Sequence, residues 1–218
     1  MKPYKEYRGW YEVRSGQTWT FGPDITLTCG SALRHTMFPA AQLVFTDPPW
    51  TQGNMTAFYN KAQAALDINF MQLIDGLAVR TDARHIFIEM GNQQAPNVTT
   101  IFESHGYRLC AAYPATYYNS RPCQVLHFAP ELPQTSIEAP GIMDDSIWPA
   151  WAIKRYTAPS DLVIDPCCGR GLIPLTAVKM GRRFWGNELN PIRLCITLEK
   201  LTDLLGFAPT PNDSETSK

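Results

Sequence analysis

The sequence predicts an α/β fold with a mostly parallel sheet and helices on both faces. Two short apolar runs, 43–46 and 162–164, each lead into an Asp-Pro step. Such a step marks a buried strand followed by a rigid loop, because proline cannot donate to a sheet ladder. Apolar residues recur at helical spacing over 57–78 and 172–180. Alternating strands and helices are typical of a parallel sheet, whose ligands bind at the carboxyl ends of the strands.

The elements are expected in one domain over residues 1–206. Residues 1–22 are expected to form either an N-terminal hairpin, which turns at Gly16 and Gln17, or an arm. Strands are expected at 25–29, 43–46, 85–90, 108–113, 123–128, 162–165 and 183–188. Helices are expected at 57–78 as one or two segments, and at 98–105, 148–156 and 172–180. Residues 130–141 form a proline-rich linker, and 207–218 lack periodicity, which predicts a disordered tail.

The loop after the strand at 43–46 carries Asp47, Pro48, Pro49 and Trp50. The lone pair of an exocyclic amine on adenine or cytosine is delocalised into the ring, and acceptors for its two N–H groups localise it. The Asp47 carboxylate and the Pro48 carbonyl are such acceptors, and Trp50 offers a flat face for an extruded base. The same residues also fit a strand end with a Pro-Pro turn and a core tryptophan. The polar stretch 51–56 that follows fits a mobile flap or an ordinary surface loop.

A second loop, at 165–171, follows the strand at 162–165 and reads Asp-Pro-Cys-Cys-Gly-Arg-Gly. Its glycines allow positive φ and close approach of the backbone to a ligand. The next strand ends at Glu188, about 20 residues later, where nucleotide-binding folds carry the carboxylate that takes ribose hydroxyls. Strand, turn, helix, strand and acid together indicate a nucleotide-like ligand.

Three segments resemble the motifs of the amino-methyltransferases that act on DNA: 47–50, 165–171 and the Gly-Asn-Glu-Leu-Asn-Pro at 186–191. The catalytic motif precedes the cofactor motif, as in the permuted β group of that family. The resemblance runs from about residue 25 to about residue 201. It implies a Rossmann-like S-adenosylmethionine-dependent methyltransferase fold, in which the hairpin adds an antiparallel strand.

The resemblance also implies site residues. S-adenosylmethionine would be held by Asp165, Pro166, Cys167, Gly169, Gly171, Glu188 and Asn190. The catalytic residues would be Asp47, Pro48, Pro49 and Trp50. In that family Asp at the first position usually accompanies N6 of adenine, whereas Ser accompanies N4 of cytosine. The expected enzyme is therefore an adenine-specific DNA methyltransferase acting on a flipped adenine.

Other interpretations stay open. N4-cytosine methylation of DNA and N6-adenosine methylation of RNA are alternative activities, and a catalytically silent cofactor-binding subunit is an alternative of another class. Ser31 stands where an acid commonly follows Gly30, and 147–149 replace a His-Pro or Lys-Pro signature. The chain has no long insert that could read a DNA sequence. Recognition of a DNA sequence could then depend on a homodimer or on a partner protein that provides specificity.

The turn between the runs 108–113 and 123–128 is crowded with Tyr117, Tyr118, Asn119 and Arg121. This tip is expected on the side of the strands' carboxyl ends. It would contact DNA beside the target base, with arginine on phosphate and tyrosine against a base. The alternative is a packed, tyrosine-rich loop.

Composition limits the class of protein. The 218 residues carry a formal net charge of −1, which excludes a strongly basic DNA-coating protein. The six cysteines form no CxxC pair or metal-type cluster with histidine, so no metal site is expected. They suit reduced thiols, and no signal peptide or membrane-spanning stretch is evident. We expect a cytoplasmic protein of a bacterium or a phage-infected cell, without membrane contact.

Overall fold

The computed structural model describes residues 5–117, 120–132, 141–144 and 146–213. Within these residues ten strands form one sheet in the order β10-β1-β2-β9-β8-β3-β4-β6-β5-β7. The strands are β1 (Gln17–Phe21), β2 (Ile25–Cys29), β3 (Ala41–Thr46), β4 (Ala83–Gly91), β5 (Arg108–Tyr117), β6 (Arg121–Ala129), β7 (Met143–Asp144), β8 (Leu162–Asp165), β9 (Arg183–Glu188) and β10 (Thr210–Asp213). The helices are α1 (Gln52–Ala62), α2 (Phe70–Arg80), α3 (Ala95–Ser104), α4 (Trp148–Tyr156), α5 (Leu172–Lys179) and α6 (Pro191–Leu205), with a 3-10 turn at Ala32–Arg34.

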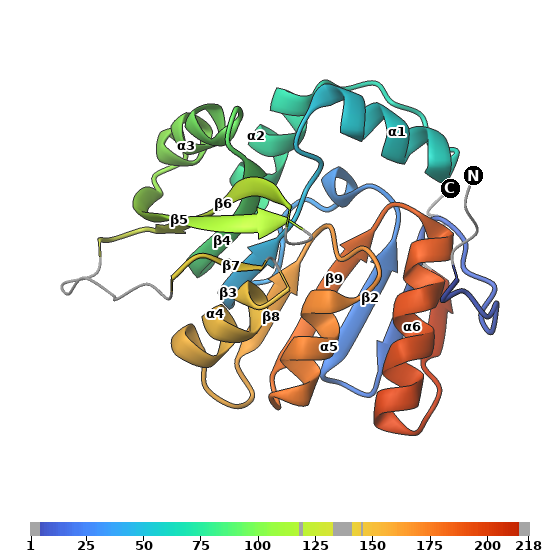
Figure 1. The fold of residues 1–218 in the computed structure, drawn as a ribbon. Helices are drawn as coiled ribbons and strands as arrows, with labels where there is room; N and C mark the ends of the chain where they lie inside the picture. The colour runs from blue at the N-terminus through green and yellow to red at the C-terminus, as the bar shows by residue number, and fades with distance from the viewer. Residues whose placement is uncertain (1–4, 118–119, 133–140, 145, 214–218) are drawn as a thin grey trace.

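The centre of the sheet is parallel. Strands β2, β9, β8, β3 and β4 pair in parallel, whereas β6 pairs antiparallel with both β4 and β5. At the other edge β1 pairs antiparallel with β2 and β10. The predicted α/β class, with an antiparallel hairpin strand beside a parallel sheet, is confirmed (Figure 1).

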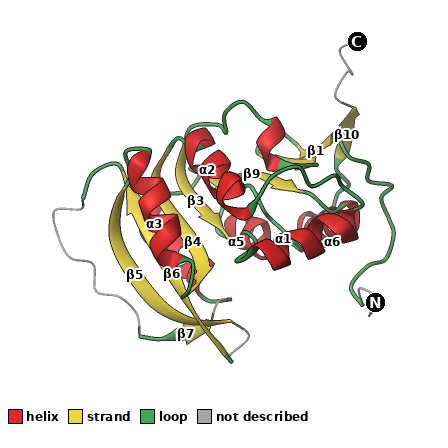
Figure 2. Ribbon diagram, turned by 90° about the horizontal axis from the view of Figure 1, so that it is seen from above, coloured by secondary structure: helices red, strands yellow, loops and turns green. Residues whose placement is uncertain are grey.

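Helices cover both faces of the sheet, α2 and α3 on one face and α4 to α6 on the other (Figure 1). Met55 and Tyr59 of α1 join the core on the side of α2 and α3, and Figure 2 shows the same elements from above. Strand β3 is therefore buried on both sides: Leu43 packs in the core under α4 to α6, and Val44 in the core under α2 and α3. This explains its continuous apolar run, which is typical of a central parallel strand. Helix α2 begins at a reciprocal capping box between Asn69 and Gln72.

The chain leaves β3 and β8 in opposite directions along the sheet. Helices α1 and α2 lead from β3 to β4, and α5 leads from β8 to β9 on the other side. The carboxyl ends of β3 and β8 are neighbours at the point where the order reverses. A ligand crevice is expected at this point of an open α/β sheet.

The predicted N-terminal hairpin turn at Gly16 is wrong. The hairpin instead joins β1 to β2 through residues 22–24. The described residues before β1 form an arm that crosses α6. There the buried Glu199 accepts backbone N–H groups from Arg8 at 3.1 Å and Trp10 at 2.8 Å. The hydrogen bond from Trp10 joins residues 189 positions apart in the chain. Contacts between such distant residues leave no local pattern in the sequence.

The predicted disordered tail is also wrong for residues 207–213. Thr210–Asp213 form β10, which pairs with β1 in the register Thr20↔Thr210. This pairing takes up backbone groups at the outer edge of β1, which a short polar segment can do without apolar periodicity. Residues 214–218 lie outside the described part of the chain.

The stretch 51–56 is helix rather than flap. The Thr51 hydroxyl accepts the Asn54 N–H at 3.2 Å and caps α1, which begins at Gln52. Most of the predicted linker, at 133–140, lies outside the described residues. Among the helices that are described, none is long and apolar enough to cross a membrane.

Candidate functional site

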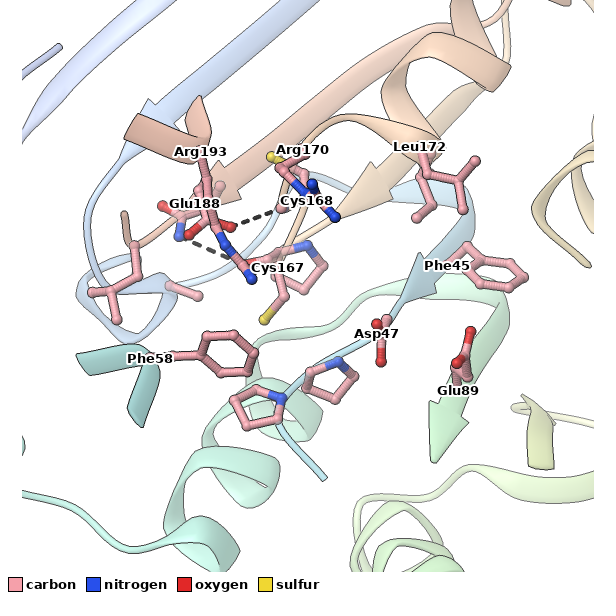
Figure 3. Close-up of a pocket in the computed structure, with 18 of the residues that line it drawn as sticks. Phe45, Asp47, Phe58, Glu89, Cys167, Cys168, Arg170, Leu172, Glu188 and Arg193 are labelled. Carbon is pink, nitrogen blue, oxygen red and sulfur yellow. Dashed lines mark hydrogen bonds between the residues drawn. The ribbon is translucent and has the colours of Figure 1, made fainter. Parts of the chain in front are cut away.

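A cavity of about 570 Å³ opens at the carboxyl ends of β3, β4, β8 and β9. Both predicted loops line it, the first with Asp47, Pro48, Pro49 and Trp50, and the second with Pro166, Cys167 and Gly169. Figure 3 shows Asp47 of the first loop and Cys167 of the second in the wall of this cavity. Segments about 120 residues apart in the chain thus share one cavity, because their strands are neighbours in the sheet.

The Asp-Pro-Pro-Trp loop folds back on itself. The indole Nε1 of Trp50 donates to Asp47 Oδ1 at 2.8 Å, and the Trp50 ring meets the Tyr117 ring edge-on at 5.0 Å between centroids. Trp50 also lies against β4, where a Cβ at Gly91 would approach the indole Cε3 to 3.1 Å. Trp50 therefore orients the carboxylate, and Gly91 makes room for Trp50.

The second loop is held by buried side chains beneath it. Gly169 has φ +57° and donates its N–H to Glu188 Oε2 at 2.8 Å, while its carbonyl accepts the Thr197 hydroxyl at 3.1 Å. Gly171 has φ +93°, and a Cβ there would lie 3.1 Å from Thr197 Oγ1. Position 171 therefore favours glycine for two reasons: the backbone has positive φ, and α6 comes too close to the loop to leave room for a side chain.

Glu188 ends β9 and lines the cavity. Besides Gly169, the Asn190 N–H donates to its Oε1 at 2.7 Å. Burial raises the pKa of Glu188, and Arg193 opposes this shift. Arg193 itself stacks on the Phe58 ring, with 4.5 Å from Cζ to the centroid. A third backbone amide, that of Leu189, also donates to Glu188. A carboxylate offers about four acceptor positions, so Glu188 is still able to accept a further hydroxyl group.

Three predicted cofactor residues do not line the cavity: Asp165, Gly171 and Asn190. Asp165 is fully buried and accepts the Cys167 N–H at 2.9 Å. Burial, with Asp47 and Glu188 adding, raises its pKa to about 8. Asn190 caps α6 by accepting the Ile192 N–H at 2.9 Å. These residues shape the loops rather than face the ligand space.

The hairpin tip is only partly described. Tyr117 and Arg121 line the cavity, whereas Tyr118 and Asn119 lie outside the described residues. Contact of this tip with DNA stays a prediction. The cations Arg121, Arg170, Arg193 and Lys200 line the cavity together with Glu6 of the N-terminal arm. Glu6 pairs with Lys200 at 3.2 Å and with Arg170 at 3.5 Å.

Several residues of the site lie outside the three motifs and were not predicted from the sequence. Phe58, Glu89 and Arg193 line the cavity, and Gly91 and Thr197 support it. Only Glu89 leaves a signal in the sequence, since it is a lone acid near the end of the apolar strand 85–90.

Comparison with known proteins identifies the fold. The sequence matches no protein-family profile and no curated protein. M1.HpyAVI, crystallised in complex with S-adenosylmethionine, matches with a TM-score of 0.61 over 81% of this chain and 98% of its own, at 14% identity. TTHA0409 of Thermus thermophilus, a proposed DNA modification methylase, matches with 0.62 over 83% and 96%, at 17% identity.

The chain has the fold of S-adenosylmethionine-dependent methyltransferases. A third match is the PvuII DNA methyltransferase, which is cytosine-N4-specific, with a TM-score of 0.57 over 84% of this chain and 92% of its own, at 14% identity. Because an N4-specific enzyme shares the fold, the fold alone does not distinguish one target amine from the other.

Proposed function

We propose that this protein transfers a methyl group from S-adenosylmethionine to an exocyclic amine of a base in DNA. The observation that carries the proposal is the meeting of the Asp47 loop and the Gly169 loop in one cavity of a methyltransferase fold. Structures with this fold have been crystallised with S-adenosylmethionine, namely M1.HpyAVI and TTHA0409.

The residues present fit this cofactor. A cavity of about 570 Å³ is within the range of small-ligand sites, roughly 300–1,000 Å³. Glu188 would accept a ribose hydroxyl at its remaining acceptor position, and the backbone of Cys167 to Gly169 would hold the methionine part. When bound, S-adenosylmethionine supplies an electrophilic methyl group on a sulfonium.

The acceptor side of the cavity would bind the target base. The Asp47 carboxylate and the Pro48 carbonyl would accept the two N–H bonds of the amine and so localise its lone pair. The Trp50 hydrogen bond keeps the Asp47 carboxylate in one orientation. Catalysis by such positioning supplies roughly 7–11 kcal/mol when the geometry is right. After transfer the proton leaves to Asp47 or to water.

We infer that the preferred amine is N6 of adenine, because Asp at position 47 accompanies adenine in the family that the motifs resemble. N4 of cytosine is the second candidate, favoured by the match to the N4-specific PvuII enzyme. The base must leave the duplex to reach a cavity at the strand ends, and Tyr117 and Arg121 at its rim would contact the flanking DNA.

The test is transfer of tritiated methyl from S-adenosylmethionine to unmethylated duplex DNA, followed by mass identification of the methylated nucleoside. We expect N6-methyladenine from the wild type and none from Asp47→Ala, with cofactor affinity retained. Asp24→Ala is a matched control, since Asp24 is exposed in the turn between β1 and β2 at the opposite end of the sheet.

The other outcomes separate the alternatives. N4-methylcytosine would keep the mechanism and overturn the adenine assignment, and transfer to RNA in preference to DNA would change the substrate class. Cofactor binding without transfer to any nucleic acid would favour a silent subunit. Failure of the wild type to bind S-adenosylmethionine would refute the enzyme proposal.

A further inference from the structure

Three charged side chains form a small network at the rim of the cavity. Glu6 of the N-terminal arm pairs with Lys200 of α6 at 3.2 Å and with Arg170 of the second loop at 3.5 Å. All three line the cavity, and the side chains of Glu6, Lys200 and Arg170 are 45%, 32% and 40% exposed. One carboxylate thus contacts two cations at a place that a macromolecule can reach.

The two cations also contact each other's residues without Glu6. The Lys200 Nζ donates to the backbone carbonyl of Arg170 at 3.1 Å, which fixes the ammonium group on the second loop. Arg170 follows Gly169, whose carbonyl accepts the Thr197 hydroxyl of α6 at 3.1 Å. Removal of the Glu6 carboxylate would therefore leave two neighbouring positive charges on a loop that α6 supports.

The N-terminal arm is held by stronger contacts than those of Glu6. Buried Glu199 accepts the backbone N–H groups of Arg8 and Trp10. The Arg8 guanidinium also pairs with Asp203 at 2.6 Å. The ion pairs of Glu6 are partly exposed, and pairs of this kind add little to stability. The Glu6 carboxylate can therefore leave both cations while the rest of the arm stays on α6.

DNA that enters the cavity brings phosphates to the same rim. The proposed reaction needs a base that has left the duplex, and the backbone of that nucleotide then passes over the mouth of the cavity. Cations at such a place bind phosphate oxygens, and arginine does so with two parallel hydrogen bonds. The formal net charge of −1 means that attraction to DNA depends on local groups of this kind. A carboxylate in contact with both cations opposes the approach of a phosphate.

We propose that Arg170 and Lys200 bind a phosphate of the DNA strand that carries the target base, and that Glu6 occupies this site in the absence of DNA. Glu6 is then an internal competitor, which the phosphate displaces when DNA binds. The inference rests on the proposed function, because it takes a flipped base as the occupant of the cavity. It adds to that function the residues that hold the DNA backbone and a segment that lowers the affinity for DNA.

The test is the affinity of the full chain for a short unmethylated duplex, measured by fluorescence anisotropy between about 50 and 200 mM salt. Phosphate contacts do not depend on the base sequence, so any duplex serves. Glu6→Gln should tighten binding about two- to tenfold at the low-salt end, and less at the high-salt end, where salt screens the carboxylate. Glu12→Gln is the matched control, because it removes the same charge from an exposed acid of the arm that pairs with Arg14.

Lys200→Gln tests the phosphate contact itself. It should weaken DNA binding and lower the slope of log affinity against log salt by about one, as the loss of one phosphate contact does. Lys179→Gln is the control, since Lys179 is exposed at the end of α5 away from the cavity. Circular dichroism shows whether each variant is folded, and binding of S-adenosylmethionine is measured for each.

The outcomes are distinct. DNA affinity in Glu6→Gln that equals or falls below the wild-type value would overturn the competition, and an unchanged salt slope in Lys200→Gln would overturn the phosphate contact. Tighter binding of S-adenosylmethionine by Glu6→Gln, with unchanged DNA affinity, would assign the cations to the cofactor carboxylate instead. Absence of methyl transfer by the wild type to any DNA would overturn the proposed function and this inference with it. Methyl transfer together with either negative binding result would overturn this inference alone.

Discussion

Replacing Trp50 by phenylalanine removes one hydrogen bond and keeps an aromatic ring. The bond lost is from Nε1 to Asp47 Oδ1, 2.8 Å long and partly buried. A hydrogen bond to a charged group is worth roughly 1.5–3 kcal/mol, and partial exposure reduces this to about 1–2 kcal/mol. Because the bond orients the group that accepts the amine, we expect kcat to fall about 5- to 30-fold. Cofactor affinity should not change.

The assay is steady-state methyl transfer to duplex DNA, with cofactor binding measured separately. Trp19→Phe is the matched control: Trp19 lies on β1 away from the cavity, and its Nε1 has no hydrogen-bond partner among the described residues. Its kcat should stay at the wild-type value. Unchanged kcat in Trp50→Phe would refute the reasoning that Trp50 orients Asp47.

The remaining predictions concern the supports of the two loops. Burial raises the pKa of Asp165 from 3.8 to about 8, so the folded protein keeps a proton that the unfolded chain releases. Relative to Asp165→Asn, the wild type should therefore lose stability as pH rises from about 4 to about 8, measured by urea unfolding; a pH-independent difference would contradict this. Gly91→Ala should displace Trp50 and lower kcat in the methyl-transfer assay, unlike Gly141→Ala, where a Cβ meets nothing within 4 Å.

The N-terminal arm reaches the rim of the cavity. Glu199 on α6 holds two backbone amides of the arm, and Glu6 reaches Lys200 and Arg170 at the rim of the cavity. The arm thereby neutralises part of the positive charge next to the Gly169 loop.

The sequence by itself determined the parallel core of the sheet and the two loops that meet at its edge. These features depend on local chemistry: proline after aspartate ends a strand, glycine permits positive φ, and apolar runs mark buried strands. That Asp47, Gly169 and Glu188 line one crevice could be predicted from the residues alone, because each lies at the carboxyl end of a strand or in the loop that follows it.

Only the tertiary structure decided which neighbours these residues have. Glu89 lies beside Asp47 because β4 pairs with β3, Gly91 admits the Trp50 ring, and Thr197 binds the Gly169 carbonyl from α6. The strand β10 and the course of the arm over α6 likewise depend on partners far away in the chain. Such contacts join residues separated by tens to nearly two hundred positions, and no periodicity or motif within either segment encodes them.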